Sequence, residues 1–368
     1  MIKVCHLTSV HPAEDVRIFH KECVSLARAG YDVYLVQRGD SYEKGGVHVI
    51  GAGIIPSNRI LRMTIGARKV YKIAKALNCS LYHIHDPELL PFCAKLLKAG
   101  KRVIFDSHEL YREQLKKKSH IGPILSRIYS CIEKRVLRKI DAVVFPCPIN
   151  GKNPFEGMCN DFAYVNNVPI LSELYEKYKE QNKKEDSICY LGTISYSRGV
   201  TNIIKAAFLA NCKLYLAGNC HNTEYLEKLR LMPQFATTEY LGVLNREEVV
   251  QLLSKVKVGM ATLLNVGQYN IADNLPTKVY EYMAMGIPSI ISETPYNIKI
   301  NEQYQFGVVV NPDSPDEIAR AINELLSDSR LYDEKARNGR RAIVSKFCWE
   351  KEQNYLLDLY SRVLNNNI

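Results

Sequence analysis

The segment Asp273–Pro288 combines a carboxylate, a proline and a cation in an order that could hold a phosphorylated ligand. Asn274 or Thr277 can cap the helix that follows, and Pro276 suits its first turn. The N–H groups and the positive dipole end of such a helix start make a seat for a diphosphate. Lys278 adds a positive charge at the same end, so the segment predicts a diphosphate site.

Glu281 lies one helical turn beyond Thr277 and Lys278. Its carboxylate can accept hydrogen bonds from two hydroxyl groups, as the 2′,3′-diol of a ribose requires. An ordinary helix with a Lys278–Glu281 surface pair explains the same residues equally well. The physics of this segment alone favours neither interpretation.

A second glycine-containing segment, Tyr190–Gly199, follows a strand-like run. Gly192 would let the backbone approach phosphate oxygens, and Arg198 could bind two of them at once. A surface turn is the more frequent explanation of such a pattern by itself. Its place in the chain ahead of Asp273–Glu281 strengthens the phosphate interpretation.

The first half of the chain carries polar residues at the ends of expected strands. Asp15 can cap the helix after the first strand, and Arg17 at its start could face a phosphate. His83 and His85 alternate onto one face of their strand, so position alone does not choose between them. His108 follows the next strand, and neighbouring parallel strands end at the same edge of a sheet.

Short apolar runs alternate with helical patterns along the whole chain, which predicts α/β units with parallel sheets. The expected strands are Ile2–Leu7, Tyr31–Gln37, Val47–Ile50, Leu81–Ile84, Val103–Phe105, Ala142–Phe145, Ser187–Leu191, Lys213–Ala217, Glu239–Leu241, Val258–Thr262, Ser289–Ile291 and Val308–Val310. The expected helices are Arg17–Ala29, Arg59–Leu77, Leu89–Lys98, a region ending at Arg138, Val200–Ala210, Tyr225–Leu231, Arg246–Lys255, Thr277–Met285, Pro315–Leu326 and Trp349–Leu364. Polar segments at Asn166–Pro169 and Glu176–Asp186 separate the two halves.

The composition is that of a soluble globular protein, with 46% hydrophobic and 24% charged residues among 368. This length predicts two domains. The eleven cysteines include no C-x-x-C pair, and Met1–Val10 has no secretory pattern. We therefore expect a reduced, cytoplasmic protein.

The net charge of +10 belongs to the first half, where residues 1–170 hold 26 Lys and Arg against 15 Asp and Glu. The segment Arg112–Lys139 places nine cations around an apolar stripe, which suits an anionic membrane surface at the inner face of the plasma membrane. An ordinary core-facing helix with a solvated charged side is the alternative, and both hold if only Arg112–Lys118 touches lipid. Nucleic acid is not expected, because a recognition motif and interleaved aromatic residues are lacking. The stripe consists of Ile121, Ile124, Leu125, Ile128, Ile132 and Val136.

The segment Asp273-x7-Glu281, followed by Ala284-Met-Gly-Ile-Pro288-Ser-Ile, resembles the donor-binding segment of family 4 retaining glycosyltransferases. Tyr190–Gly199 is similar to the element of that family whose cation grips the donor phosphates. The family has Glu where this chain has Asp273, and often Arg where it has Thr193. The resemblance covers roughly residues 1–362.

The resemblance implies the GT-B fold: two Rossmann-like, doubly wound parallel-sheet domains facing a central cleft, with a C-terminal helix crossing back to the first domain. The implied domains are 1–168 for the acceptor, 169–345 for the donor, and 346–368 for the returning helix. The implied catalytic residues are His85, His108 and Asp273. The implied donor-binding residues are Gly192, Arg198, Asn274, Leu275, Pro276, Thr277, Lys278 and Glu281, and Asp15 and Arg17 lie on the acceptor or phosphate side.

The implied reaction moves a sugar from a nucleotide-diphosphate sugar to a glycan or polyprenyl-linked acceptor with retention, in surface polysaccharide assembly. The chain has no Asp-x-Asp, so we expect Arg198, Lys278 and a helix dipole to hold the diphosphate with neither a metal nor another cofactor. A nucleotide-sugar epimerase of the same two-domain plan and a non-catalytic binding relative are the alternatives. A nicotinamide dehydrogenase is disfavoured, since no G-x-G-x-x-G follows the first strand.

Overall fold

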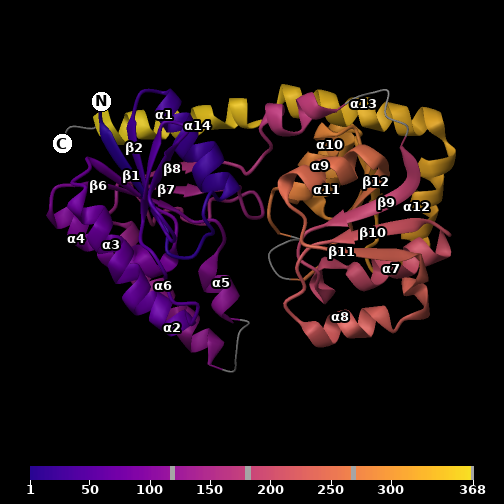
Figure 1. Ribbon diagram of the computed structural model, residues 1–368, viewed down its shortest axis with the longest axis horizontal. Coiled ribbons are helices and arrows are strands. Elements are labelled where there is room, and N and C mark those ends of the chain that lie inside the picture. Colours follow the sequence, from indigo (N-terminus) through magenta and orange to yellow (C-terminus); the bar gives the residue numbers. More distant parts are fainter. Residues whose placement is uncertain (117–120, 179–183, 267–270, 366–368) are drawn as a thin grey trace. The chain divides into compact units, whose positions relative to one another are not determined.

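A computed structural model describes residues 1–116, 121–178, 184–266 and 271–365. The chain divides into two compact units: the first comprises Met1–Asn167 with Lys351–Ile368, and the second comprises Val168–Glu350. The boundaries expected from the sequence were after residues 168 and 345. The last helix therefore begins in the second unit and continues in the first (Figure 1).

The first unit contains an eight-stranded sheet in the order β3-β4-β2-β1-β5-β6-β7-β8. All neighbours are parallel except β3, which pairs antiparallel with β4. The strand order runs outward from β1 in one direction through β2 and β4 and then in the other through β5, β6, β7 and β8, which creates a topological switch point between β1 and β5. The strands are β1 (Lys3–Leu7), β2 (Asp32–Gln37), β3 (Tyr42–Lys44), β4 (Val47–Gly51), β5 (Leu81–Ile84), β6 (Arg102–Asp106), β7 (Ala142–Phe145) and β8 (Asp161–Tyr164).

Helices cover both faces of this sheet. One core lies between the sheet and α3, α4 and α6, and it includes Cys5, Tyr82 and Phe105. The alternate side chains His6 and His83 point to the opposite face, where the last helix supplies Tyr360. The helical segments are η1 (Val16–Cys23), α1 (Val24–Arg28), α2 (Arg59–Leu61), η2 (Arg62–Gly66), α3 (Ala67–Ala76), η3 (Pro87–Leu89), α4 (Leu90–Lys98), α5 (Tyr111–Lys116), α6 (Gly122–Leu137) and α14 (Trp349–Asn365).

The second unit contains a six-stranded, fully parallel sheet in the order β11-β10-β9-β12-β13-β14. This is the Rossmann order, with its switch point between β9 and β12. The strands are β9 (Glu185–Leu191), β10 (Lys213–Ala217), β11 (Thr238–Gly242), β12 (Val256–Ala261), β13 (Ser289–Ser292) and β14 (Gly307–Val310).

Two separate apolar cores sandwich this second sheet. One lies under α9, α10, α11 and α13, and the other lies under α7, α8 and α12; Figure 1 shows the two groups on opposite faces of the strands. The helical segments are η4 (Leu171–Glu173), η5 (Tyr175–Lys177), η6 (Tyr196–Arg198), α7 (Val200–Leu209), α8 (Thr223–Arg230), η7 (Pro233–Thr237), α9 (Arg246–Lys255), α10 (Thr277–Ala284), α11 (Pro295–Tyr304), α12 (Pro315–Ser327) and α13 (Ser329–Ser345).

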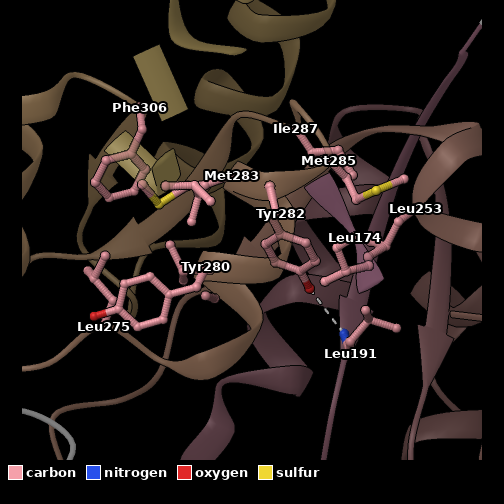
Figure 2. Packing of buried hydrophobic residues seen from close by; sticks show 14 of the residues in the cluster. Leu174, Leu191, Leu253, Leu275, Tyr280, Tyr282, Met283, Met285, Ile287 and Phe306 are labelled. Carbon is pink, nitrogen blue, oxygen red and sulfur yellow. Dashed lines mark hydrogen bonds between the residues drawn. The ribbon is translucent and has the colours of Figure 1, made fainter. Parts of the chain in front are cut away.

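Helix α10 is locked to the sheet by Tyr282, which is fully buried. The N–H of Leu191, at the end of β9, donates a hydrogen bond of 3.2 Å to the Tyr282 hydroxyl, as Figure 2 shows. A Cβ at Gly259 of β12 would lie 2.2 Å from the Tyr282 ring, so this strand position requires glycine. The contact between Tyr282 and Leu191 therefore holds α10 next to the loop that follows β9.

The fold contains elements that the sequence patterns did not predict: β3, β8, α11 and α13. The Ala, Gly and Ile residues that α13 buries are separated by charged ones, and its sequence is too polar for a clear apolar stripe. Strand β3 has only three residues, which is too short for an alternation pattern to register. None of the eleven cysteines, all in the described part of the chain, forms a disulfide.

The apolar stripe on α6 faces outward, which contradicts the alternative of an ordinary core-facing helix. Ile121, Ile124, Leu125, Ile128 and Ile132 are 43% to 62% exposed. The buried side of α6 is instead small and polar: the Ser126 hydroxyl donates to the Arg112 carbonyl, and buried Glu133 pairs with the Arg112 guanidinium at 2.8 Å. Two of the nine expected cations, Lys117 and Lys118, lie outside the described residues.

Candidate active site

The predicted phosphate site of the second unit lies at its switch point, where β9 ends and α10 begins. Gly192 follows β9 with φ of 123°, and the carbonyl of Gly192 lies 1.9 Å from where a Cβ of Gly218 would stand. Gly199 has φ of 72° and its Cβ would lie 1.9 Å from the Thr262 carbonyl. At Gly199 and Gly218 the backbone segments therefore approach one another more closely than a side chain would allow. Gly192 itself is exposed and lies beside Lys278.

Lys278 is the least compensated charge among the described residues of the second unit. Its side chain is buried, and its Nζ atom has no hydrogen-bond partner. The ammonium group lies 3.4 Å from the centre of the Tyr190 ring and 3.3 Å from the Cβ position of Gly192. Burial, and then the nearby positive charge of Arg198, hold the pKa of Lys278 well below its ordinary value. The side chains of Lys278 and Arg198 are thus close enough for each to act on the charge of the other.

The start of α10 differs from the expected cap. The helix begins at Thr277 with Pro276 in the capping position, and no side chain of the described residues caps it. The Asn274 side-chain oxygen instead accepts a hydrogen bond of 2.6 Å from the Tyr280 hydroxyl. The N–H groups at this helix start are therefore not capped by Asn274 or Thr277, and they can serve an anionic ligand.

Leu275 is a core residue, 2% exposed, so only its backbone can contact a ligand; Figure 2 shows its side chain beside Tyr280. Asp273 and Asn274 are half-buried, and Thr277 is exposed at the helix start. The predicted donor residues from Asp273 to Lys278 therefore lie around one helix terminus.

Glu281 does not form the surface pair with Lys278 that the sequence allowed. Its Oε1 atom accepts a hydrogen bond of 2.6 Å from Arg246 at the start of α9, and Arg246 also contacts Glu173 at 3.2 Å. Glu281 is 17% exposed. The hydrogen bond from Arg246 therefore fixes the orientation of the Glu281 carboxylate, which lies in the second turn of α10. Sequence reasoning missed Arg246 and Glu173, because nothing in their local pattern indicates that they meet Glu281.

Arg17 of the first unit, which is predicted to face a phosphate, is hydrogen-bonded inside the unit. Asp15 caps η1, accepting from the N–H groups of Arg17 and Ile18. The guanidinium is buried and forms two hydrogen bonds of 3.0 Å with Asp106 and one of 2.9 Å with the Val165 carbonyl. All three of its nitrogens are engaged inside the unit, so Arg17 is a structural cation here.

His85, which is predicted to lie beside the reacting sugar, is buried within the first unit. Its Nε2 atom lies 2.9 Å from His6 Nδ1, and its Nδ1 atom lies 3.2 Å from His108 Nε2 and 3.4 Å from Asp106. The hydroxyl of Tyr360 joins His6 and His83 at 2.8 and 2.9 Å. Burial lowers the pKa of His85 to about 4, so the ring is neutral.

His108 reaches the surface, in keeping with its predicted place at a strand end. Its side chain is 22% exposed, and its Nε2 atom lies 3.2 Å from Asp106. Burial favours the protonated form of Asp106, but Arg17 and then His108 outweigh burial and hold the pKa of this carboxyl well below its ordinary value. The ionised carboxylate of Asp106 is therefore buried next to the partly exposed imidazole of His108.

A second pair of this kind, which the sequence analysis did not assign, joins His11 to Asp86. His11 Nδ1 lies 3.2 Å from Asp86 Oδ1, and the His11 side chain is 23% exposed. The His11 and His108 rings are 4.7 Å apart. The only local signal is that His11 follows β1 and Asp86 follows β5, two strands that become neighbours in the sheet.

Two groups of ligand-type atoms in the first unit lie close enough to hold a metal ion: His6 with Glu22, His83 and His85, and His85 with Asp106 and His108. The rings of His6, His83 and His85 are stacked or tilted against one another at 4.5 to 5.1 Å. Both ring nitrogens of His6 already lie within hydrogen-bond distance of His85 or Tyr360, so the first group suits a hydrogen-bonded network better than a metal centre.

Comparison with known proteins identifies the class. The model for glycosyl transferases group 1 matches residues 172–342, and the model for glycosyltransferase family 4 matches residues 17–149. Each match lies within one of the two units. The chain belongs to the family 4 glycosyltransferases, and its two parallel-sheet units have the GT-B architecture.

The curated relatives are distant. An uncharacterized glycosyltransferase of Methanocaldococcus jannaschii is 24% identical over 182 residues, which cover 48% of this chain and 45% of the relative. A second uncharacterized glycosyltransferase of that organism is 23% identical over 80% of this chain and 77% of the relative. Spore coat protein SA of Bacillus subtilis is 32% identical, over 23% of this chain and 22% of its own length. The chain thus aligns with under half the length of the first and the third.

Solved structures share the fold over the whole chain. A sucrose-phosphate synthase from Thermosynechococcus elongatus has a TM-score of 0.75 at 16% identity, covering 100% of both chains. The Anabaena protein HepE, solved with UDP and glucose, has a TM-score of 0.71 at 13% identity, covering 98% of this chain and 100% of its own. At these identities the likeness establishes the architecture alone.

Proposed function

We propose that this family 4 member transfers a sugar from a nucleotide-diphosphate sugar to a glycan or polyprenyl-linked acceptor with retention, in surface polysaccharide assembly. The second unit binds the donor and the first unit binds the acceptor. The solved HepE structures contain UDP, and one of them contains UDP-glucose, which supports a nucleotide-sugar donor.

One observation carries this proposal: the buried side-chain nitrogen of Lys278 has no hydrogen-bond partner among the described residues. A buried charge without a partner costs several kcal/mol, so a protein keeps it where a ligand supplies the counter-charge. Exposed Gly192 and the uncapped start of α10 border the same point, and Arg198 adds a second charge. A diphosphate placed there receives backbone N–H groups, a helix dipole and two cations.

The same groups stabilise the leaving diphosphate, which is the main catalytic contribution that we assign to the second unit. Negative charge develops on the diphosphate as the sugar–phosphate bond breaks, and Lys278 and Arg198 neutralise it. Because two cations and a helix terminus already supply this charge, we propose that transfer needs no divalent metal. Activity that persists in EDTA supports this, and activity restored only by a divalent ion contradicts it.

The direct test incubates the purified protein with labelled nucleotide sugars and follows both products and the anomeric configuration by NMR. Transfer or net donor hydrolysis with a retained anomeric configuration supports the proposal. Formation of an epimer identifies a nucleotide-sugar epimerase instead. Donor binding without turnover identifies a non-catalytic relative, and inversion contradicts the retaining mechanism.

We also propose that α2, η2 and α6 of the first unit bind an anionic membrane surface. Ile60, Leu61, Met63 and Ile65 are exposed like the stripe on α6. Arg59 of α2 lies over the Tyr111 ring, which packs edge-on against Tyr129 of α6, so these helices occupy one side of the unit. Exposed apolar residues flanked by cations are typical of helices lying in a lipid interface. Within the described residues no helix is both long and apolar enough to cross a bilayer.

Flotation with anionic and with neutral vesicles tests this surface. Ile124→Gln with Ile128→Gln should abolish retention on anionic vesicles, while Leu231→Gln, which changes an 83% exposed residue of the second unit, should leave it intact. Retention should also fall as salt rises from about 50 mM, because ions screen surface charges. Equal retention of both variants, or none of the unchanged protein, contradicts membrane binding.

A further inference from the structure

A cavity of about 890 Å³ in the second unit is lined by residues of α13, the end of α12 and the segments around η5 and the start of β9. Among the described residues that line it, five are cations and one, Asp333, carries a carboxylate. Lys257 also pairs at 2.5 Å with Asp186, which lies outside the lining. The excess of cations makes the cavity a candidate anion site. These cations are Lys184, Lys257, Arg337, Arg340 and Arg341.

Three of the five cations lie on one face of α13. Arg337, Arg340 and Arg341 are three and four residues apart, so their side chains project from neighbouring positions of the helix. Like charges at this spacing repel one another, and an anion bound between them offsets the repulsion. A guanidinium group can donate two parallel hydrogen bonds to one phosphate group, so this face of α13 suits phosphate recognition.

Lys184 and Arg340 connect the cavity to the end of α10. Lys184 Nζ donates a hydrogen bond of 3.1 Å to the Met285 carbonyl, and Arg340 Nη1 donates one of 2.6 Å to the Ala284 carbonyl. The Arg340 guanidinium also lies 3.8 and 4.1 Å from the ring centres of two tyrosines that line the cavity. Burial, assisted by Arg340, lowers the pKa of Lys184 to about 7, and a bound anion would favour its charged form. These two cations are therefore held in place before a ligand binds.

The cavity lies at the edge of the second sheet opposite to the predicted donor site. Lys184 directly precedes β9, and Lys257 is the second residue of β12, so both stand at the amino ends of their strands. Gly192, in contrast, follows the carboxyl end of β9. The cavity contacts the last residues of α10 and the donor site its first residues, and a helix of eight residues is about 12 Å long. The two sites are therefore separate.

We propose that this cavity binds a soluble small molecule that carries more than one phosphate group. Five cations against one lining carboxylate match several negative charges rather than one, and a volume of about 890 Å³ is typical of pockets that hold small organic ligands. A second ligand site goes beyond the proposed function and does not depend on it.

Calorimetric titration of the full chain with a graded set of probes tests the ligand class. Fructose 1,6-bisphosphate should bind, fructose 6-phosphate should bind roughly 10-fold or more weakly, and fructose should not bind, because each phosphate adds charge-assisted hydrogen bonds. Citrate, which carries several carboxylates, should bind more weakly than the bisphosphate. No binding of the bisphosphate, or equal affinity for citrate or for fructose 6-phosphate, overturns the assignment.

Two matched double variants locate the binding. Arg337→Gln with Arg341→Gln removes two exposed charges of the cavity and should lower the affinity for fructose 1,6-bisphosphate by roughly 10-fold or more. Arg320→Gln with Arg330→Gln removes two exposed charges of the same unit outside the lining and should leave that affinity unchanged. Equal losses in the two variants would show general attraction to a basic protein and overturn the site.

A third arm separates this cavity from the donor site. Lys278→Met, and saturating UDP in the unchanged protein, should both leave the affinity for fructose 1,6-bisphosphate within about 2-fold, because the donor site lies at the other end of α10. Loss of bisphosphate binding in either case would place the ligand in the donor site and overturn the proposal. If the protein neither binds UDP nor turns over a nucleotide sugar, the proposed function fails, while bisphosphate binding that depends on Arg337 and Arg341 still supports the second site.

Discussion

The two units bury ionisable groups in opposite ways. In the first unit the buried charges of Arg17 and Asp106 pair with each other, although both carboxyl oxygens of the neighbouring Glu22 have no hydrogen-bond partner among the described residues. In the second unit Lys278 is buried near Arg198, and within the described part of the chain its side-chain nitrogen has no hydrogen-bond partner. A satisfied buried network contributes rigidity and holds neighbouring side chains in place, whereas an unsatisfied buried charge costs stability until a ligand binds. We therefore interpret the buried groups of the first unit as holding side chains in position, and the buried Lys278 of the second unit as a binding group for the donor phosphates.

The largest effect should come from breaking the satisfied network. Burial, and then Asp106, raise the pKa of Glu22 well above its ordinary value, which favours its protonated form, and we therefore expect Glu22→Gln to cost little stability. In Asp106→Asn we expect Glu22 to ionise and to take the place of Asp106 as the anion that pairs with Arg17, because Arg17 Nε lies 3.0 Å from Glu22 Oε1. The double variant leaves Arg17 unpaired and should lose roughly 3–5 kcal/mol of unfolding free energy. Urea denaturation of all four proteins tests this, and additive losses would contradict the proposed protonation of Glu22.

The next effect should appear at the unsatisfied charge, with opposite signs for stability and for binding. Lys278→Met should raise the melting temperature of the ligand-free protein, because it removes a desolvated charge, and should weaken UDP binding by roughly 2–5 kcal/mol. Calorimetry and thermal shift measure the two quantities, with exposed Lys299→Met as the control. A destabilised variant with unchanged UDP affinity would remove the evidence for the diphosphate site.

Acid should weaken the first unit specifically. Burial lowers the pKa of His85 to about 4 in the folded protein. In the unfolded chain the same ring has a pKa of about 6.5, so between these pH values it binds a proton only when the chain is unfolded. Stability from this group is complete above about pH 6.5, falls as pH decreases, and bottoms out below 4, a loss on the order of 3 kcal/mol. Hydrogen exchange at several pH values should show the amides of β1 and β5 losing protection before those of β9 and β12. Equal loss in both units would contradict this.

The smallest effect concerns Glu281, whose carboxylate is shared between the predicted ribose contact and Arg246. Glu281→Gln keeps the shape but removes the charge, and we expect UDP affinity to fall by roughly 1.5–3 kcal/mol, as for a hydrogen bond to a charged group. Glu173→Gln changes the other carboxylate of Arg246 and should have little effect on affinity. Equal effects of the two variants would show that Glu281 acts only through Arg246.

The sequence by itself determined the alternation of strands and helices, because apolar runs of strand length separated by amphipathic helices specify parallel sheets. It also located the segment around Lys278, since a glycine loop and a helix start are local features. Short or polar elements such as β3 and α13 have too weak a hydrophobic pattern to be predicted from the sequence. The apolar stripe of α6 is exposed, although apolar helix faces are usually buried.

Tertiary structure alone decided the roles of side chains that meet across the sheet. Arg17 and Asp106 are 89 residues apart, and His6 and Tyr360 are 354 apart. Whether a histidine is buried and neutral, as His85 is, or exposed beside a carboxylate, as His11 is, depends on which strands become neighbours. Local sequence fixes the residue type and the strand end on which it stands. Burial and partners, which set its charge, come only from packing of the whole unit.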